Sequence, residues 1–482
     1  MSLMLRRTKI VATLGPATDT PDRLEAILRA GVDMARINFS HGTAEEHIGR
    51  VARLRDAARK VGKIVGVLAD LPGPKLRVRL PVPRHLQADD TVTFALSEDR
   101  ADPNDIILSE PEVLADIRTG QRLLLDDGRL QLEAISFTNG RLRARVLVGG
   151  LLQPNKGLNL PDTAVSLPAV TARDREALSV AARAGVDWVA LSFVRSPEAA
   201  HDIRAACAEV GLDVPVLAKI ERPEAVERAT AIIAAFDAIM VARGDLGVEI
   251  PLERVPTVQK LLIAEARAAR KPVVTATDML DSMRENPRPT RAEASDVANA
   301  IFDGTDAVML SGETAVGKYP VEAVAYMHRI ALETESQLVQ SGFTVGADVP
   351  QPINPIHDPI TAGACELARQ VGARALVTPT LSGRTARMAA EYRPAARVVA
   401  VAPSEAILRR LTLVWGITSV LMTPTNPGTD RLSAAVADAC AAGAVQPEEQ
   451  VVVLAGHPIE GGPRFPTVRI VRVGPDGISG EP

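Results

Sequence analysis

Short apolar runs alternate with amphipathic helical stretches over the first two-thirds of the chain. The runs have the length of strands and are mostly apolar rather than strictly alternating, which is typical of parallel strands buried on both faces. There are eight of them, at residues 9–15, 33–39, 64–70, 187–193, 215–220, 238–244, 272–278 and 307–312. Eight strand-and-helix units predict an α/β fold with a closed (β/α)8 TIM barrel rather than an open sheet.

One connection in this pattern is interrupted. The helix-like spacing of apolar residues stops after Asp70 and resumes only near Thr171. In between, four stretches alternate like strands of an antiparallel sheet, and Asp127-Gly128 and Asn139-Gly140 are hairpin signals. We therefore expect a small β-barrel domain inserted after the third barrel strand, where it would serve as a lid over the site.

The last third of the chain begins with a proline-rich stretch at residues 343–359, which indicates a linker. Strand and helix patterns then alternate again, which predicts a smaller open α/β domain with a doubly wound sheet. The expected limits are residues 1–71 and 169–342 for the barrel, 72–168 for the lid, and 360–475 for the C-terminal domain.

Composition narrows the class of function. The 482 residues carry 59 acidic and 55 basic side chains, so the formal net charge of −4 gives no overall attraction to nucleic acid or acidic membranes. The three cysteines lie far apart and form neither a disulfide framework nor a cysteine zinc site. No stretch approaches the apolar length of a membrane span. We expect a cytoplasmic protein with no nucleic-acid or membrane partner.

In a barrel of this kind the chemistry lies where strands run into the loops that follow them. These positions are strongly polar here: Arg36, Asn38, Ser40, His41, Asp70, Lys219, Glu221, Gly244, Asp245 and Thr277. Contact with solvent would account for one or two charges at each strand end. It does not account for the two-residue spacing from Arg36 to Asn38 or from Lys219 to Glu221, which places both side chains on one strand face.

Glu221 and Asp245 end neighbouring strands, so their carboxylates can converge on one cation. Oxygen ligands without nearby histidine or cysteine favour Mg²⁺ or Mn²⁺. Lys219 beside that metal and Arg36 across the mouth would suit a phosphate-bearing substrate. The alternative for Glu221 is a plain salt bridge to Lys219 or Arg222.

Several longer stretches resemble the pyruvate kinase family over nearly the whole chain. They are TKIVATLGPAT (8–18), MARINFSHG (34–42), NKGLNLP (155–161), AKIERPEA (218–225), IMVARGDLGVEIP (239–251) and residues 286–320. The resemblance implies transfer of the phosphoryl group of phosphoenolpyruvate to ADP, giving pyruvate and ATP in the last step of glycolysis. It also implies a homotetramer and a second Mg²⁺ that arrives with the nucleotide.

The resemblance further implies a role for each matching residue. Glu221 and Asp245 would hold Mg²⁺, and Lys219 would stabilise the phosphoryl group during its transfer. Thr277 would lie near the proton route to the enolate. The other contacts would be Arg36 to the phosphoryl group, Gly244, Asp245 and Thr277 to the substrate carboxylate, and Arg77, His41 and Lys156 to the nucleotide phosphates.

The chain departs from the family pattern where a glutamate is usual. The stretch that begins at Asp70 is DLPGPKLRV, with Lys75 in the place of that glutamate. The resemblance implies a K⁺ site formed by Asn38, Ser40, Asp70 and the carbonyl of Leu71. The ammonium of Lys75 would supply the charge of this ion, so we expect activity without K⁺. The alternative is neutral drift in a solvated loop.

A loop of the C-terminal domain carries Thr380, Ser382, Gly383, Arg384 and Thr385 before a predicted helix. Such a loop can hold a phosphate, and in the family this region resembles the loop for a sugar-phosphate effector; a nucleotide effector or a plain N-capped loop are the alternatives. Two other functions are alternatives to that of the pyruvate kinase family. One is a Mg²⁺-dependent lyase or aldolase on an enolpyruvate-type substrate, and the other is a catalytically silent sensor of phosphosugars.

Overall fold

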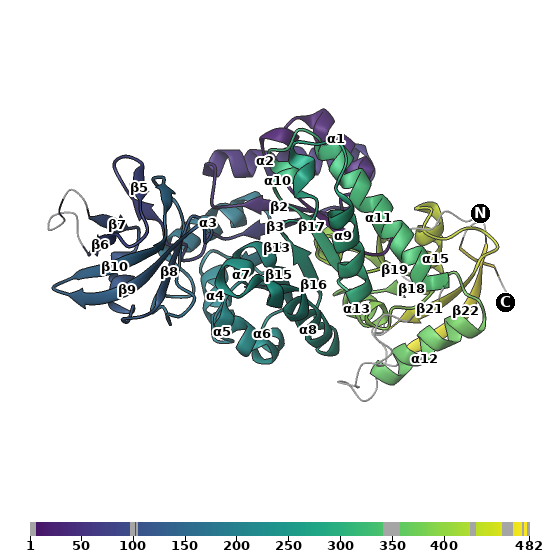
Figure 1. Cartoon of the computed structure of the whole chain (residues 1–482). Coiled ribbons are helices and arrows are strands. Elements are labelled where there is room, and N and C mark those ends of the chain that lie inside the picture. The colour runs from purple at the N-terminus through teal and green to yellow at the C-terminus, as the bar shows by residue number, and fades with distance from the viewer. Residues whose placement is uncertain are drawn as a thin grey trace.

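The computed structural model describes residues 6–96, 102, 105–340, 357–424, 430–455, 466–474 and 477–479. In Figure 1 a barrel lies in the middle, with a β domain on one side of it and an α/β domain on the other. The chain leaves the barrel after β3 (Gly66–Asp70) and rejoins it before α3 (Ala172–Ala184). The β domain is therefore inserted into a single strand-to-helix connection of the barrel.

Eight parallel strands close the barrel in the order β1-β17-β16-β15-β14-β13-β3-β2. Besides β3, they are β1 (Lys9–Thr13), β2 (Met34–Asn38), β13 (Trp188–Leu191), β14 (Val216–Ile220), β15 (Ala238–Ala242), β16 (Val273–Ala276) and β17 (Ala307–Leu310). The predicted TIM barrel is thus confirmed. Each strand ends one or two residues earlier than the apolar run that predicts it, except β3 and β14, which end with their runs.

Helices surround this barrel, and together with α3 they bury its outer face. They are α1 (Pro21–Ala30), α2 (Ala44–Lys60), α4 (Ala199–Glu209), α5 (Pro223–Glu227), α6 (Ala229–Ala235), α7 (Arg243–Glu249), α8 (Val255–Ala268), α9 (Arg291–Asp303), α10 (Gly312–Ala315) and α11 (Pro320–Gln340). Their apolar faces pack on outward-facing strand residues such as Ile10 and Ile37 in one continuous core.

The inward-facing strand residues form a second apolar cluster that fills the barrel. Met34, Leu68 and Leu217 belong to this cluster. Because side chains alternate between the two faces of a strand, the residue two positions further along also faces inward. These next residues are Arg36, Asp70 and Lys219. The strand periodicity that fills the barrel therefore also delivers three charged groups to its carboxyl end.

The inserted domain has its own leucine- and valine-rich core. Its main sheet has the order β12-β8-β9-β10-β6-β7-β4, and β11 pairs with β5. The strands are β4 (Val78–Arg79), β5 (Arg84–Leu86), β6 (Thr91–Ala95), β7 (Ile106–Leu108), β8 (Arg122–Leu125), β9 (Leu130–Thr138), β10 (Arg141–Val148), β11 (Gly150–Leu152) and β12 (Leu158–Asn159). Left-handed residues at Asp127-Gly128 and Asn139-Gly140 confirm both predicted hairpin turns.

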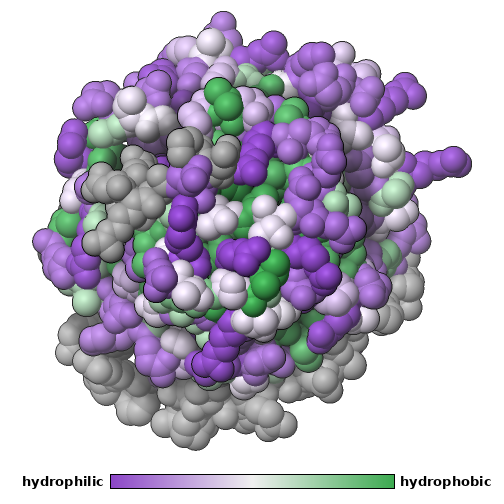
Figure 2. Space-filling model, turned by 60° about the vertical axis from the view of Figure 1, so that its left-hand side comes forward, coloured by the Kyte–Doolittle hydropathy of each residue, from purple (hydrophilic) through white to green (hydrophobic). Residues whose placement is uncertain are grey.

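The surface on the side of this inserted domain is mostly hydrophilic. Figure 2 shows hydrophobic residues there only in small groups between polar ones. Among the described residues, no helix has the length and apolar character needed to cross a membrane.

The C-terminal domain is an open sheet in the order β20-β19-β18-β21-β22-β23. Its elements are α12 (His357–Gln370), β18 (Ala375–Pro379), α13 (Arg384–Glu391), β19 (Arg397–Ala402), α14 (Glu405–Leu411), β20 (Ile417–Leu421), α15 (Arg431–Ala441), β21 (Gln450–Ala455), β22 (Thr467–Gly474) and β23 (Gly477–Ser479). One sheet face is buried with residues of α12, α13 and α14, and the other with α15. The predicted α/β domain is confirmed, and its last two strands, β22 and β23, pair antiparallel.

The predicted linker at residues 343–359 needs a correction. Residues 343–356 lie outside the described part of the chain, but residues 357–359 already belong to α12. Asp358 explains why the helix begins before Pro359: its buried carboxylate bonds to Arg270 of the barrel at 2.5 Å. Proline is also tolerated in the first turn, where its missing N–H would have no helical partner.

Candidate active site

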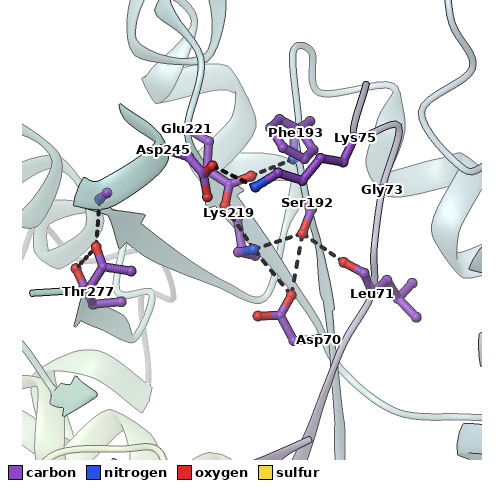
Figure 3. A network of polar contacts seen from close by, with 12 residues as sticks. Asp70, Leu71, Gly73, Lys75, Ser192, Phe193, Lys219, Glu221, Asp245 and Thr277 are labelled. Carbon is purple, nitrogen blue, oxygen red and sulfur yellow. Dashed lines mark hydrogen bonds and ion pairs between the residues drawn. The ribbon is translucent and has the colours of Figure 1, made fainter. Parts of the chain in front are cut away.

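Lys219 is the centre of a buried polar network at the carboxyl end of the barrel (Figure 3). Its Nζ donates a hydrogen bond to Oγ of Ser192 at 2.8 Å and lies 3.2 Å from Oδ1 of Asp70. A third contact, at 2.8 Å, is to Oε1 of Glu221. Burial alone would lower the pKa of Lys219, but the two carboxylates outweigh it and raise that pKa above its usual value. The ammonium is therefore held permanently charged.

Glu221 has one carboxylate oxygen fixed and one available. Its Oε2 accepts a hydrogen bond from the backbone N–H of Phe193 at 2.8 Å. Its Oε1 is buried and accepts no hydrogen bond of good geometry, although Lys219 is close. Burial raises the pKa of Glu221, the charge of Lys219 opposes this shift, and Asp245 adds to it. A buried carboxylate oxygen that lacks a well-oriented hydrogen-bond donor is a suitable ligand for a cation.

Asp245 supplies the second carboxylate of the expected metal site. It lies in the first turn of α7, directly after β15, and β15 pairs with β14 beside Glu221. No group of three or more His, Cys, Asp or Glu side chains with metal-binding geometry occurs among the described residues. The donor set at this site is thus two carboxylates, which fits Mg²⁺ because that ion keeps water and substrate oxygens in its shell.

Arg36 closes the opposite side of the site. Its Nε donates to Oδ2 of Asp70 at 2.6 Å, and its Nη1 donates to Oγ1 of Thr13 at 3.0 Å. Burial alone would raise the pKa of Asp70, but Arg36 and Lys219 together lower it. Asp70 therefore remains ionised and holds two cations side by side, and cations in this arrangement can form charge-assisted hydrogen bonds with an anion.

Thr277 and Gly244 meet at the edge of the site. The backbone N–H of Gly244 donates to Oγ1 of Thr277 at 2.6 Å. Thr277 and Asp278 both have left-handed backbones, with φ of 67° and 54°. Such values are costly for residues with side chains and are held here by Arg243, whose Nη2 donates to the carbonyl of Thr277 at 2.8 Å.

The three residues expected at the nucleotide are not all together. Arg77 lies close enough to His41 to help lower the pKa of that imidazole, although burial is the larger cause. Lys156 instead forms an ion pair within the lid, with its Nζ 2.6 Å from Oδ1 of Asp126. Arg77 connects the two regions, because its Nη1 donates to the carbonyl of Asn155 at 2.8 Å.

The four groups expected at the K⁺ site are partly engaged with each other and with neighbours. Oδ1 of Asn38 accepts a hydrogen bond from the N–H of Ser40 at 3.0 Å. The carbonyl of Leu71 accepts one from Oγ of Ser192 at 2.8 Å. Lys75 points to the other side of the site, where its Nζ lies 3.3 Å from Oδ1 of Asp245 (Figure 3). Its ammonium is thus placed at the Asp245 carboxylate and not at the Asp70 group.

The loop of the C-terminal domain borders a cavity of about 380 Å³. Of the predicted loop residues, Thr380, Ser382, Arg384 and Thr385 line this cavity, together with His357, Met422 and Arg431 among others. Gly383 is not a lining residue, but its φ of 79° forms the turn and its N–H donates to Oγ1 of Thr380 at 3.0 Å.

Arg243, a polar residue at the end of its strand in the sequence pattern, holds Thr277 in place. One residue of the barrel site was missed from the sequence: Ser192, which joins Lys219, Asp70 and Leu71. It directly follows a barrel strand, so the position rule that predicts Asp70 also applies to it. The fourth strand end was passed over because Ser192 is uncharged.

The geometry of the site agrees with the family of proteins that this chain resembles in sequence. The family model described as "Pyruvate kinase, barrel domain" matches residues 5–324, and the one described as "Pyruvate kinase, alpha/beta domain" matches residues 358–471. The pyruvate kinase of Geobacillus stearothermophilus is 45% identical over 95% of this chain and 78% of its own length. That of Clostridium acetobutylicum is 41% identical over 94% of this chain and 97% of its own length.

Neither alternative function receives support: the relatives are pyruvate kinases, and the residues expected to carry the reaction are present. The chain belongs to the pyruvate kinase family and is a phosphotransferase that transfers the phosphoryl group of phosphoenolpyruvate to ADP.

Proposed function

We propose that the transfer takes place between the Lys219 network and the lid, with Glu221 and Asp245 holding a Mg²⁺ ion. The observation that carries this assignment is the buried Oε1 of Glu221, which lacks a hydrogen-bond donor of good geometry beside a permanently charged lysine. When bound, the metal supplies positive charge that neutralises the oxygens of the transferring group. Mn²⁺ has the same ligand preferences and would serve in its place.

Positively charged side chains of the protein provide the remaining electrostatic stabilisation of the phosphoryl group. Arg36 binds the phosphoryl group in the ground state, and Lys219 stabilises the charge that spreads over its oxygens during transfer. Asp70 holds both cations in position, so neither has to reorient as the reaction proceeds. This preorganisation is what separates the site from a chance cluster of strand-end charges.

The substrate carboxylate is assigned to the junction of Gly244, Asp245 and Thr277. The N–H of Gly244 donates to Oγ1 of Thr277, and the Thr277 hydroxyl donates to the carbonyl of Ala276; both donors would turn to the substrate carboxylate when it binds. After transfer, the enolate must take up a proton, and the Thr277 hydroxyl is placed to relay it through water. Asp278 next to it has a pKa raised by burial and by Asp281.

The lid is assigned to the nucleotide. Arg77 and His41 at the lid entrance and Lys156 on the lid would contact the ADP phosphates. Lys156 would exchange its ion pair with Asp126 for a phosphate, because both partners are oxygen anions. We also propose that the domain limits given above, with the C-terminal domain beginning at His357, a cytoplasmic location and a homotetramer hold for this chain.

Independence from K⁺ is proposed on the strength of Lys75. Its ammonium lies beside Asp245 rather than at Asn38, Ser40, Asp70 and Leu71, and from there it would supply the positive charge that a monovalent ion otherwise brings to the active site. A phosphorylated effector, either a sugar phosphate or a nucleotide, is assigned to the cavity beside Thr380, Ser382, Arg384 and Thr385.

The experiment that tests the assignment replaces the central lysine. Lys219→Met should lower kcat for pyruvate formation by about 10³-fold, because the buried cation aimed at the transferring group is lost. Lys318→Met, which removes an exposed lysine paired with Glu285, is the matched control and should retain full activity. Retained activity in a correctly folded Lys219→Met enzyme would overturn the assignment.

A further inference from the structure

The lid returns to the barrel through a segment that two barrel arginines hold by its backbone. Nη2 of Arg222 donates to the carbonyls of Leu160 and Thr163, at 3.1 and 3.2 Å. Arg195 donates to the carbonyls of Val165 and Leu167. The return connection is therefore fixed to the barrel along most of its length.

Arg222 is also part of a buried side-chain network that reaches the lid. Its Nη1 donates to both oxygens of Glu249, at 2.9 and 3.0 Å. Oε1 of Glu249 in turn accepts a hydrogen bond from Nδ2 of Asn159 at 2.8 Å. The side chains of Arg222 and Glu249 are only 7% and 1% exposed. We call Asn159, Arg222 and Glu249 the hinge latch.

The position of the hinge latch in the chain connects it to the chemistry. Arg222 directly follows Glu221, and Glu249 lies one helical turn after Asp245 on α7. On the lid, Asn159 follows Lys156 by three residues. One buried network thus joins the elements that carry both metal carboxylates to the lid segment that carries the expected nucleotide lysine.

Only an arginine can make this set of contacts. The guanidinium of Arg222 uses its Nε and Nη2 on Glu224, its Nη1 on Glu249 and its Nη2 on two lid carbonyls. A lysine would keep the charge next to Glu249 but has a single point donor group, so it could not hold the carboxylate and both carbonyls together. A simple buried ion pair would not need this geometry.

We propose that Arg222 is a positioning residue, which through the hinge latch fixes the lid in the placement where Lys156 and Arg77 contact the nucleotide. The inference rests on the proposed nucleotide role of those two residues. A lid with a loosened hinge spends less time in the productive placement, so ADP binding suffers more than phosphoenolpyruvate binding.

The test compares Arg222→Lys and Asn159→Ala with the control Arg55→Lys. Arg55 is a comparable, largely buried arginine that bonds Asp187 and the carbonyls of Val65 and Gly185 at the amino end of the barrel. Both latch variants should raise KM for ADP by about fivefold or more, with less than about a twofold change in KM for phosphoenolpyruvate. Amide hydrogen exchange of residues 157–165 should accelerate in the latch variants only.

The outcomes separate the latch from the nucleotide assignment. If Arg222→Lys and Asn159→Ala leave KM for ADP and the exchange of residues 157–165 unchanged, or alter them no more than Arg55→Lys does, the latch is overturned. Asn159→Ala keeps the Arg222–Glu249 pair and so decides the question if Arg222→Lys folds poorly. Lys156→Met is measured alongside: an unchanged KM for ADP there would refute the nucleotide role of Lys156, while the exchange data still test the latch.

Discussion

Lys75 stands where the family resemblance leads us to expect a glutamate, and its charge has a defined place. The ammonium lies 3.3 Å from Asp245 and 170 positions away from it in the sequence. Lys75→Glu would replace a cation beside the metal carboxylates with a third carboxylate. We expect the variant to lose at least about tenfold in kcat without K⁺ and to regain most of it in KCl, because a monovalent cation then compensates the added charge.

The measurement is the initial rate in tetramethylammonium chloride against KCl at equal ionic strength. Lys75→Arg is the matched control: it keeps the positive charge and should remain indifferent to K⁺. A Lys75→Glu enzyme that is equally active in both salts would show that the position drifts without consequence.

The residue scale also shows how far the sequence predicts the site. Arg36, Asp70 and Lys219 follow from strand periodicity, because each lies two positions after a residue that fills the barrel. The contact between Lys75 and Asp245 could not be predicted in this way. The position of a residue after a strand places it at the carboxyl end of the barrel, but it does not say toward which neighbour the side chain points. Ser192 could have been found by position, whereas its three-way contact required the fold.

At the scale of elements, the outgoing lid connection depends on one glycine. Gly73 has a φ of 64°, and a Cβ there would lie 2.9 Å from Cβ of Ser192 and 3.0 Å from Cδ2 of Phe193. Gly73→Ala therefore adds backbone strain of about 1–2 kcal/mol and pushes on two residues that contact Lys219 and Glu221. We expect lower stability together with a several-fold loss of apparent Mg²⁺ affinity.

Urea denaturation and Mg²⁺ titration of activity measure the two effects separately. Gly62→Ala is the control, because Gly62 has a nearly equal φ of 67° but nothing within 4 Å of an added Cβ. It should lose similar backbone stability and keep its Mg²⁺ response. Equal Mg²⁺ responses in both variants would contradict the role given to Gly73.

Elements differed in how well the sequence predicted them. The eight barrel strands are long apolar runs, and β9 and β10 are flanked by clear turn residues. The sequence therefore predicts both the barrel strands and these two long strands of the inserted domain. Strands β4 and β12 have two residues each, which is too short for any periodicity to appear. They form only because neighbouring strands supply their hydrogen-bond partners, which is a property of the folded domain.

At the scale of the whole molecule, the lid and the C-terminal domain lie at opposite ends of the barrel. The C-terminal domain covers the amino end: Leu413 belongs to the cluster inside the barrel, and Nε of Arg409 donates to Asp187 at 2.9 Å. A ligand beside the Thr380 loop is therefore separated from the active site by the length of the barrel strands. Any effect it has on activity must pass through this interface.

The interface contains a carboxyl group that titrates near neutral pH. Burial raises the pKa of Glu391 to about 7, although Arg270 and Arg387 oppose this shift. Its unfolded pKa is near the model-peptide value of roughly 4.3, so between these two values the folded state holds a proton that the unfolded state has released. The folded state consequently loses stability as pH rises through this window, by up to roughly 4 kcal/mol in total.

Glu391→Gln is neutral at every pH and removes this penalty. The variant should match the parent protein near pH 4.5 and exceed its stability above pH 7, with the difference in Tm growing across the window between them. Scanning calorimetry from pH 5 to 8.5, in steps of about half a unit, follows this divergence. Glu366→Gln is the control without a pH-dependent difference in this range, because the hydrogen bond to Arg369 lowers the pKa of Glu366, which therefore stays ionised in both states above pH 5. Parallel stability curves for Glu391→Gln and the parent would show that Glu391 stays ionised at the interface throughout.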